Sequence, residues 1–398
     1  RGLELSQGLR ERHYDTARQL LGPARYERFH SALEQEFDSL DELLRGIAAV
    51  GELSPRTSDY VVSYGERLSS KIVTAAFGAM GLNSALVDAR EVMITDGQHT
   101  KAVPLVEEVD CRSQKIIAPL LAAGRVPVVG GFIGSTKEKV QTTIGRGGSD
   151  YSAALFGAAL NAEVIEIWTD VDGMMTTDPH ICPDAHRIKV ISFEEAAELA
   201  YFGAKVLHPA TVMPAVRKNI PVRVLNSRNP RNEGTLIVSQ APHSKSIFKA
   251  IAAKKGITII DVCATRMLMA HGFLRQIFEV FDRHRCSVDV VATSEVSVSV
   301  TVDSTQSIPQ IMADLKSMAD VHFKERNAIV CLVGENIREK AGIAAQIFTA
   351  LGNINVRMVS QGASEINITF VIDEEQVPEA IRRLHKHFFS APDPNIFD

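Results

Sequence analysis

The sequence lacks the features that define membrane and nucleic-acid-binding proteins. No apolar stretch approaches the roughly 20 residues of a membrane-spanning helix, and the first residues, RGLELSQGLR, contain no apolar signal-peptide block. No dense run of lysine or arginine occurs, and the formal net charge is -5. A basic surface that could follow a phosphate backbone is therefore not expected. We predict a cytosolic (cytoplasmic) protein without nucleic-acid or membrane partners.

Cysteine is also scarce, and its distribution carries no motif. The five cysteines are odd in number and form no CxxC pair, so neither a disulfide framework nor a zinc motif can be recognised. Reduced, mostly structural thiols are the simplest interpretation. The content of 45% hydrophobic and 23% charged residues is that of an ordinary folded protein. The 398 residues suffice for two or three domains, because a single core seldom exceeds about 250 to 300 residues.

The hydrophobic pattern changes along the chain. Apolar residues at helical spacing up to about Gly46 predict a helix-rich N-terminal region. From Tyr60 onward, helical patterns alternate with short apolar runs bounded by Gly, Pro, Asn or Asp. This alternation predicts an α/β sheet with helices on both faces. The expected strands include residues 85–87, 126–129, 163–169 and 222–224.

The C-terminal part contains an internal repeat. The polar, turn-rich segment SQAPHSKS at 239–246 is the best linker candidate. Beyond it, seven residues recur at an offset of 70, beginning with Gly272 and Gly342 and ending with Asp303 and Asp373. Each copy shows a helix, two strands and a second helix, which predicts two ferredoxin-like βαββαβ units. The expected elements are 273–284, 287–292, 296–302 and 308–318, and then 343–351, 355–360, 366–372 and 377–388.

The most informative motif is GRGGSD at 145–150. It precedes a small-residue helical stretch at 152–160, so a glycine-rich loop leads into a helix N-terminus. Successive glycine amides there form an anion cradle, although a tight structural turn is the alternative for the glycines alone. Arg146 offers a fixed fork for a carboxylate or phosphate, and Asp150 a carboxylate for Mg2+ or a cation.

A second polar group follows the apolar run at 164–168. Thr169, Asp170, Asp172 and Asp178 come after this expected strand, and ligands bind at the carboxyl ends of strands in open α/β sheets. Caps and turns explain the same residues equally well, because Asp, Gly and Thr favour them.

Three further side chains allow both a functional and a structural interpretation. Glu66, which we place at the start of a helix over 67–78, could receive a substrate ammonium, or could favour a helix N-terminus electrostatically. Lys205 could reach a phosphate or lie solvated on the surface. For His208 and His271, a packed or surface position is the simpler interpretation.

Together these motifs resemble the aspartate kinases of the amino-acid kinase family, in particular their lysine-sensitive branch. The C-terminal repeat looks like a tandem pair of ACT domains. The resemblance covers almost the whole chain. It is carried by VSYGERLSS (62–70), GGFIGS (130–135), TTIGRGGSDYSAAL (142–155), IWTDVDG (167–173), TTDP (176–179) and EEAAELAYFGAKVLHPAT (194–211).

The resemblance implies a fold and domain boundaries. The expected fold is an α/β three-layer αβα sandwich followed by two ferredoxin-like βαββαβ (ACT) domains. Residues 1–238 would form the kinase domain and 239–247 the linker. Residues 265–325 would form the first ACT domain, and 248–264 with 326–398 the second.

The resemblance also implies the reaction. ATP with Mg2+ would phosphorylate the side-chain carboxylate of L-aspartate, which is ionised at neutral pH because its unperturbed pKa is about 3.9. No general base is then needed, and catalysis reduces to alignment and charge neutralisation. By this resemblance Arg146 would bind the α-carboxylate and Glu66 the α-ammonium of aspartate. Asp150 would organise the transfer site, in the loop with Gly147 and Gly148.

The implied nucleotide residues include two departures from the family. Thr169, Asp170, Asp178 and Lys205 would hold the nucleotide with Mg2+. Met175 stands where the family commonly has Tyr, and His180 where it has Arg, so adenine or phosphate contacts there are open. The family also opens with a strand and a K-F-G-G-T-S loop, whose lysine lies against the transferred phosphoryl. No such segment precedes Arg1, and we expect the sequence to be a fragment.

The resemblance places an effector, lysine by expectation, on the first ACT copy. Backbone amides after a strand would bind its carboxylate, and Asp289 or Glu295 its cationic group. Turn residues at a dimer interface are the alternative. A homodimer, or a tetramer built from it, is expected because ACT modules usually pair across a two-fold axis. The implied effector residues are Met267, His271, Gly272, Phe273, Leu274, Asp289, Thr293, Ser294, Glu295 and Val296.

Two other functions remain open at this stage. Another kinase of the same fold would accept glutamate, acetylglutamate or UMP, although the ACT tail speaks against it. A catalytically silent amino-acid sensor would bind lysine but not ATP. Nothing after Phe388 starts a second enzyme with a GxGxxG motif, although related kinases are fused to homoserine dehydrogenase or a decarboxylase.

Overall fold

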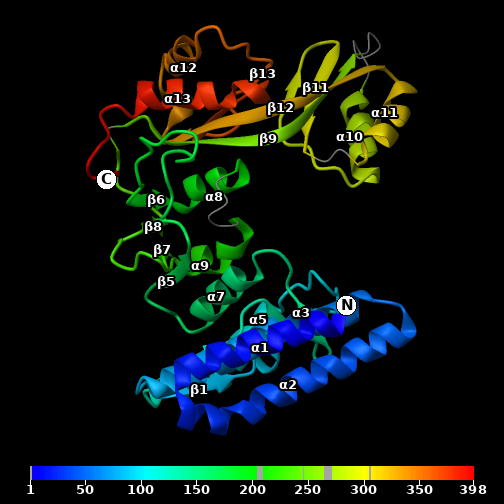
Figure 1. Ribbon diagram of the computed structural model, residues 1–398. Helices are drawn as coiled ribbons and strands as arrows, with labels where there is room; N and C mark the ends of the chain where they lie inside the picture. The colour runs from blue at the N-terminus through cyan, green and yellow to red at the C-terminus, as the bar shows by residue number, and fades with distance from the viewer. Residues whose placement is uncertain (1, 204–208, 245, 264–270, 304–305) are drawn as a thin grey trace. The chain divides into compact units, whose positions relative to one another are not determined.

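The computed structural model describes residues 2–203, 209–244, 246–263, 271–303 and 306–398, and they form two compact units (Figure 1). The first unit contains residues 1–167 and 210–222, and the second contains 168–209 and 223–398. This division differs from the predicted domain boundaries, because residues 168–209 group with the C-terminal repeat. The boundaries themselves stay a prediction.

Three long helices begin the first unit, where the sequence predicts a helix-rich region. They are α1 (Gly2–Leu21), α2 (Pro23–Val50) and α3 (Pro55–Ala79). Gly22 separates the first two with a positive φ of 69°, and Pro23 then begins α2. The three helices enclose a common apolar core that includes Leu33, Phe37 and Leu68.

The start of α3 corrects the prediction for Glu66. The sequence analysis places a helix start at Arg67, but α3 begins at Pro55, where the N-cap Ser54 accepts a hydrogen bond from the Thr57 amide. Gly65, an exposed position with open space around it, does not interrupt the helix. Glu66 therefore lies in the helix interior, and the preference of glutamate for helix N-termini does not explain it.

The remainder of the first unit is α/β. Strands β1 (Ser84–Val87) and β2 (Val126–Val129) pair in parallel, and β3 (Ile133–Ser135) pairs antiparallel with β4 (Gln141–Thr143). Buried residues of β1 and the helices pack into one core, which includes Val87, Val92 and Ile117. The helices are α4 (Ala89–Val92), α5 (Val106–Ile116), α6 (Ala118–Ala122), α7 (Gly148–Ala159), η1 (Pro209–Val212) and α9 (Met213–Lys218).

A four-stranded sheet has the order β5-β7-β8-β6. Its strands are β5 (Ile165–Thr169), β6 (Val190–Ser192), β7 (Val222–Asn226) and β8 (Thr235–Val238). Helix α8 (Phe193–Tyr201) follows β6 directly, and Ser192 forms a complete capping box with Glu195. The strands expected at 85–87, 126–129, 163–169 and 222–224 are all present, and the α/β class is confirmed.

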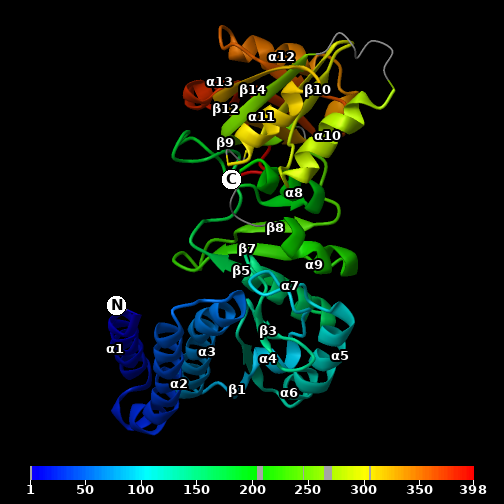
Figure 2. The ribbon, with the colours of Figure 1, turned by 90° about the vertical axis from the view of Figure 1, so that its right-hand side faces the viewer.

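The C-terminal repeat forms one six-stranded sheet rather than two separate ones. Its order is β10-β11-β9-β12-β14-β13, and the long strands β9 (Phe248–Cys263) and β12 (Asp320–Gly334) run antiparallel through both halves (Figures 1 and 2). The first copy adds α10 (Phe273–Arg283), β10 (Val291–Thr293), β11 (Ser297–Val302) and α11 (Ile308–Lys316). The second adds η3 (Ile337–Glu339), α12 (Ile343–Leu351), β13 (Met358–Ser360), β14 (Asn367–Asp373), η4 (Glu374–Gln376) and α13 (Val377–Phe388).

The first strand of each copy is shorter than predicted. The sequence analysis begins the strands at Ser287 and Asn355, but they begin at Val291 and Met358. In the first copy the amides of Asp289 and Val290 donate to the backbone oxygen and the hydroxyl of one residue, Thr301. A regular ladder cannot form where two successive amides bond the same residue.

Candidate active site

Two loops of the first unit meet beside the glycine-rich motif. The loop that follows β2 lies against the first turn of α7, because a Cβ on Gly131 would lie 3.0 Å from the Cα of Ser149. A Cβ on Gly148 would lie equally close to the Phe132 ring. The Phe132 amide also donates to the Ser152 hydroxyl, at 3.0 Å. Glycine at 131 and 148 therefore allows the close approach of these loops.

Glu66 lies at the same place. A Cβ on Gly130 would contact the Glu66 Cβ at 3.4 Å, so α3 passes directly beside the loop that follows β2. The Glu66 side chain is half-buried, and among the described residues it has no hydrogen bond or ion pair. Burial alone raises the pKa of its carboxyl.

Asp150 is a second carboxylate with no partner among the described residues. It lies in the first turn of α7, where burial raises the pKa of its carboxyl, and it too lacks a described polar partner. Arg146, four residues before it, is exposed and makes no ion pair within the described chain. The structure thus places Glu66 and the start of α7 around one loop, and the charged groups there are available for a ligand.

Sequence reasoning missed a buried carboxylate that supports this region. Asp59 on α3 is fully buried and accepts hydrogen bonds from the Thr143 hydroxyl (2.5 Å) and the Thr100 amide (2.9 Å). It also contacts Nδ1 of His99 at 2.7 Å. The carbonyl oxygen of Thr100 would lie 3.0 Å from a Cβ on Gly145. Asp59 thereby fixes the segment against which the glycine motif packs.

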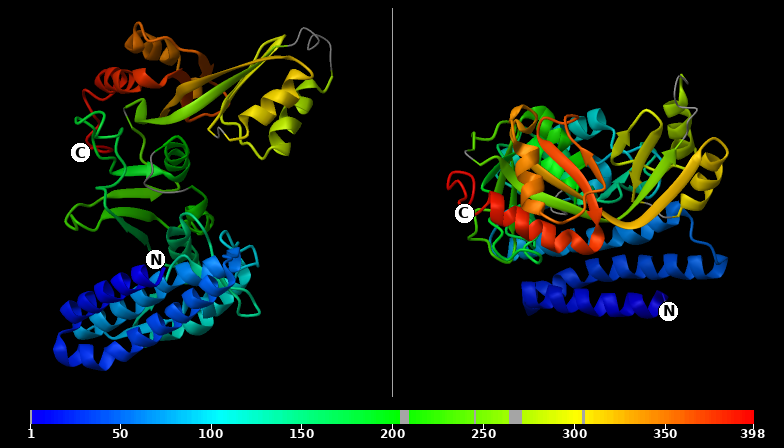
Figure 3. Two further views of the ribbon diagram at one scale, coloured as in Figure 1. Left: turned by 45° about the vertical axis from the view of Figure 1, so that its right-hand side comes forward. Right: turned by 90° about the horizontal axis from the view of Figure 1, so that it is seen from above.

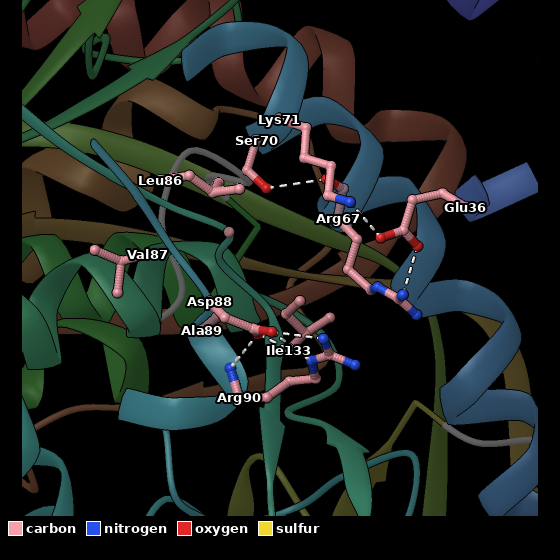
Figure 4. A pocket seen from close by; sticks show the side chains of 11 residues that line it. Glu36, Arg67, Ser70, Lys71, Leu86, Val87, Asp88, Ala89, Arg90 and Ile133 are labelled. Atoms are coloured by element: carbon pink, nitrogen blue, oxygen red, sulfur yellow. Dashed lines mark hydrogen bonds and ion pairs between the residues drawn. The ribbon is translucent and has the colours of Figure 1, made fainter. Parts of the chain in front are cut away.

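A pocket at the carboxyl end of β1 contains paired charges (Figure 4). Arg67 and Lys71 both contact Glu36, the latter at 2.6 Å. Two guanidinium nitrogens of Arg90 donate hydrogen bonds to the two carboxylate oxygens of Asp88. Burial raises the pKa of Asp88, but these hydrogen bonds outweigh it and hold the pKa below its usual value. Gly130 lines this pocket, and a Cβ added to it would lie 3.4 Å from the Cβ of Glu66.

In the second unit, the candidate nucleotide residues follow β5. The Thr169 backbone oxygen accepts hydrogen bonds from both the amide and the hydroxyl of Ser227. The Thr169 hydroxyl donates to Asp170 at 3.3 Å. Asp172 accepts from Asn226 and Asn229, at 2.8 and 3.3 Å, and so joins the two loops. Sequence reasoning missed these loop residues, although the turn-rich NSRNPRN segment directly after a strand was a usable signal.

The TTDP segment is held by neighbours within the second unit. Asp178 is exposed, and it accepts a hydrogen bond from the His180 amide and contacts Nδ1 of the same residue. Met175 forms an isolated bridge with Arg187. The predicted contact Lys205, together with His208, lies outside the described residues.

Thr176 joins this segment to the second copy of the repeat. Its backbone oxygen accepts a hydrogen bond from the Ile251 amide at 2.7 Å, and its hydroxyl is hydrogen-bonded to Nε2 of His385 at 2.9 Å. His385 is buried between the rings of His186 and Phe389. Burial, and then the nearby His186, lower the pKa of His385.

The predicted effector residues fall into two groups. The Asp289 amide donates a hydrogen bond to the backbone oxygen of Thr301. The Ser294 amide donates to the backbone oxygen of Ser297, at the start of β11, and the hydroxyls of these two serines are also hydrogen-bonded. Asp289 and Ser294 are five positions apart, which corresponds to about 16 Å in an extended chain. His271, Gly272 and Leu274 are exposed at the start of α10 and Phe273 is buried, while Thr293, Ser294, Glu295 and Val296 are exposed. Met267 lies outside the described residues. A single effector site in one chain stays a prediction.

Comparison with known proteins assigns the class. The amino acid kinase family pattern matches residues 15–226, more than half of the chain, and an ACT domain pattern matches 330–388. The chain therefore belongs to the amino acid kinase family, whose fold with ACT domains agrees with the architecture described above. No helix among the described residues is long and apolar enough to cross a membrane.

Within that family the chain is similar to aspartokinases. It is 38% identical to aspartokinase 2, chloroplastic, of Arabidopsis thaliana over 90% of this chain and 69% of the relative. The crystal structure of E. coli aspartokinase III with aspartate and ADP (R-state) superposes with a TM-score of 0.83 at 34% identity, covering 97% and 87% of the two chains. The structure of the same enzyme with lysine and aspartate (T-state) superposes with a TM-score of 0.77 at 36% identity, covering 93% of this chain and 83% of that one. The chain spans 65 to 69% of the length of the plant aspartokinases it matches.

Proposed function

We propose that this protein transfers the γ-phosphoryl group of ATP to the side-chain carboxylate of L-aspartate. The products are 4-phospho-L-aspartate and ADP, and the reaction is the first step of lysine, threonine and methionine biosynthesis. Support comes from the similarity to aspartokinase III, whose structure holds aspartate and ADP. The predicted cytosolic location stays a prediction, and the plant relatives are named as chloroplastic.

The observation that carries the proposal is the set of unpaired charges around the loop after β2. Glu66 and Asp150 are half-buried carboxylates without described partners, and Arg146 is an exposed guanidinium without one. Burying an ionisable group without a partner costs free energy, so such groups occur mainly where a ligand supplies the partner. An amino acid offers an ammonium for Glu66 and an α-carboxylate for Arg146.

The chemistry requires little from the protein beyond alignment. A side-chain oxygen of aspartate attacks the γ-phosphorus, and the bond from that phosphorus to the β–γ bridging oxygen breaks, which releases ADP. The nucleophile is already ionised at neutral pH, because its unperturbed pKa is about 3.9. The Gly147 amide and the N-terminus of α7 would stabilise charge on the transferred group. The Gly148 amide donates to the Gly145 carbonyl oxygen at 3.0 Å and would hold the turn that presents this end of the helix. Asp150 would orient the cationic groups that accompany the phosphates.

Mg2+ enters with ATP as part of the substrate. The described residues contain no cluster of three or more His, Cys, Asp or Glu side chains that could hold a metal alone. Mg2+ commonly takes one or two carboxylates together with substrate phosphates, so this composition fits. Thr169, Asp170, Met175, Asp178 and Lys205 are our proposed nucleotide contacts.

A coupled assay of ADP release tests the proposal. ADP release from ATP should depend on L-aspartate and should fall when lysine is added. Glutamate, acetylglutamate and UMP serve as alternative acceptors. The assay uses the chain alone and the chain with a K-F-G-G-T-S strand fused before Arg1. If neither form releases ADP with aspartate, or if another acceptor is preferred, the proposal is wrong.

One observation favours a second candidate, a catalytically silent amino-acid sensor. His180 stands where the family commonly has Arg, and it occupies Asp178 with two contacts. A sensor would bind lysine but not ATP in calorimetric titrations, whereas the kinase binds both. The predicted homodimer is tested separately, by light scattering on a size-exclusion column.

A further inference from the structure

A buried carboxylate on α3 holds the backbone of the loop at residues 96–103. Helix α3 lies side by side with α1 and α2 (Figure 3), and it also contacts β4. Asp59 of α3 is fully buried, and both of its oxygens accept from the Thr100 amide, at 2.9 and 3.1 Å. The Thr143 hydroxyl and Nδ1 of His99 also contact it, at 2.5 and 2.7 Å. Burying a carboxylate costs free energy unless it is hydrogen-bonded, so Asp59 and the loop hold each other in place.

Thr100 has a backbone conformation that it would not adopt by itself. Its φ is 70°, in the left-handed region, where a β-branched residue is an outlier. Thr100 is exposed, so packing of its side chain does not explain this conformation. Residues with such backbone strain persist only where their surroundings fix them, and they cluster at functional sites. Asp59 fixes the Thr100 amide, and two residues later the Ala102 amide donates to the backbone oxygen of Thr143 at 2.9 Å.

The strained residue lies against the first glycine of the GRGGSD motif. A Cβ on Gly145 would lie 3.0 Å from the backbone oxygen of Thr100 and 3.5 Å from the Cα of Lys101. Gly145 has a positive φ of 88°, and its carbonyl oxygen accepts from the Gly148 amide at 3.0 Å. Arg146 is the next residue of the chain. The Thr100 peptide therefore limits the course of the backbone from which the Arg146 side chain projects.

We propose that Asp59 is a positioning residue for the amino-acid substrate: by holding Thr100 in its left-handed conformation, it sets the turn at Gly145 and thereby the direction of Arg146. This inference rests on the proposed function, because it takes Arg146 as the group that binds the α-carboxylate of aspartate. The effect of Asp59 on the substrate passes through the backbone of two loops. A purely structural role would instead lower the stability of the first unit and leave the affinity of the folded protein for aspartate unchanged.

Hydrogen exchange followed by mass spectrometry tests the positioning without any ligand. Asp59→Ala removes the carboxylate that binds the Thr100 amide, and alanine is a strong helix former, so α3 should persist. We expect exchange at least about tenfold faster in peptides that cover residues 97–103 and 145–151, because local opening of the two loops becomes easier.

Asp96→Ala is the matched control. Asp96 is a second carboxylate of the same loop, and it accepts hydrogen bonds from the amides of Gln98 and Val103. Its loss removes amide contacts at the base of the loop but leaves the Thr100 amide paired. Exchange in residues 145–151 should therefore stay within about twofold of the wild-type rate.

Calorimetric titration with L-aspartate measures the consequence for the substrate. We expect Asp59→Ala to weaken binding by about tenfold or more, and Asp96→Ala by less than about twofold. Asp59→Asn should bind within about threefold of wild type, since its Oδ1 can still accept from the Thr100 amide and the Thr143 hydroxyl.

Adding Thr100→Gly to Asp59→Ala tests the strain itself. Glycine adopts a positive φ without strain, so the double variant should regain at least about threefold in aspartate affinity. Should Asp59→Ala not fold, Thr100→Pro replaces it, because proline lacks the amide hydrogen and cannot adopt a positive φ. This change is made at an exposed residue and leaves the buried carboxylate in place.

The outcomes separate this inference from the proposed function. Unchanged exchange or unchanged aspartate affinity in the folded variant overturns the inference. An equal loss in Asp96→Ala, no recovery with Thr100→Gly, or no aspartate binding by the wild-type chain overturns it as well. If aspartate binds but no ADP is released, only the proposed function is refuted, because neither measurement needs turnover.

Discussion

The buried ion pair between Lys249 and Glu195 leads to a quantitative prediction. The ammonium lies 2.9 Å from Oε2 of Glu195, and both side chains are at most 2% exposed. The same oxygen accepts hydrogen bonds from the amide and hydroxyl of Ser192, while Oε1 has no hydrogen-bond partner in the part of the chain that the structure describes. In Lys249→Met the carboxylate stays buried without its cation. Breaking a buried pair in this way costs about 3 to 5 kcal/mol, a large part of a typical stability of about 5 to 15 kcal/mol.

Urea denaturation followed by Trp168 fluorescence measures this loss. Trp168 is the sole tryptophan of the sequence and belongs to the same unit as the pair. Lys255→Met is the control, because Lys255 is an exposed residue of the same strand. We expect the control within about 0.5 kcal/mol of wild type.

The double variant Lys249→Met/Glu195→Gln separates charge from packing. Glutamine keeps the hydrogen bonds to Ser192 but carries no charge, so the double variant should be at least about 1 kcal/mol more stable than Lys249→Met alone. A loss below about 1 kcal/mol in Lys249→Met, or no recovery in the double variant, would show that the pair is solvated in solution and would refute this reasoning.

Three further predictions concern single residues. Burial raises the pKa of Glu66, so the folded state favours the protonated acid, and ionisation of the carboxyl at higher pH costs stability. Glu66→Gln should therefore stabilise the first unit against urea at pH 7, yet raise the KM for aspartate by tenfold or more (about 1.4 kcal/mol). The control Glu107→Gln, at an exposed position, should change neither the stability nor the KM. Arg146→Lys should raise that KM by about tenfold with little change in unfolding, because lysine lacks the planar fork; an unchanged KM contradicts the assignment. The pKa of His385 is lowered in the folded state, so the protein loses stability as the pH falls from about 6.5, the ordinary histidine pKa, towards that lowered value. His385→Gln should therefore show a flatter dependence of Tm on pH between 5 and 7.5. A dependence as steep as that of the wild type would refute the role of His385.

The locally encoded features could be predicted from sequence. Apolar spacing predicted the helix-rich start and most elements of both repeat copies, because spacing along the chain decides which face of an element is apolar. Short apolar runs predicted the strands at 85–87 and 126–129. Glycines at 145 and 147 indicated a turn that the structure realises with positive φ. The repeat offset of 70 showed that two similar units exist, but it could not show that β9 and β12 pass through both.

Tertiary structure alone decided the polar partners. Asp59 meets Thr143 across 84 positions, Tyr201 meets Asp289 across 88, and Lys249 meets Glu195 across 54. Pairings at such separations leave no periodic signal, since they depend on how the chain folds back and which side chains lose their water. The same holds for the grouping of 168–209 with the repeat. Sequence by itself thus determined most of the elements that form; folding decided which charged side chains pair with one another and which have no described partner.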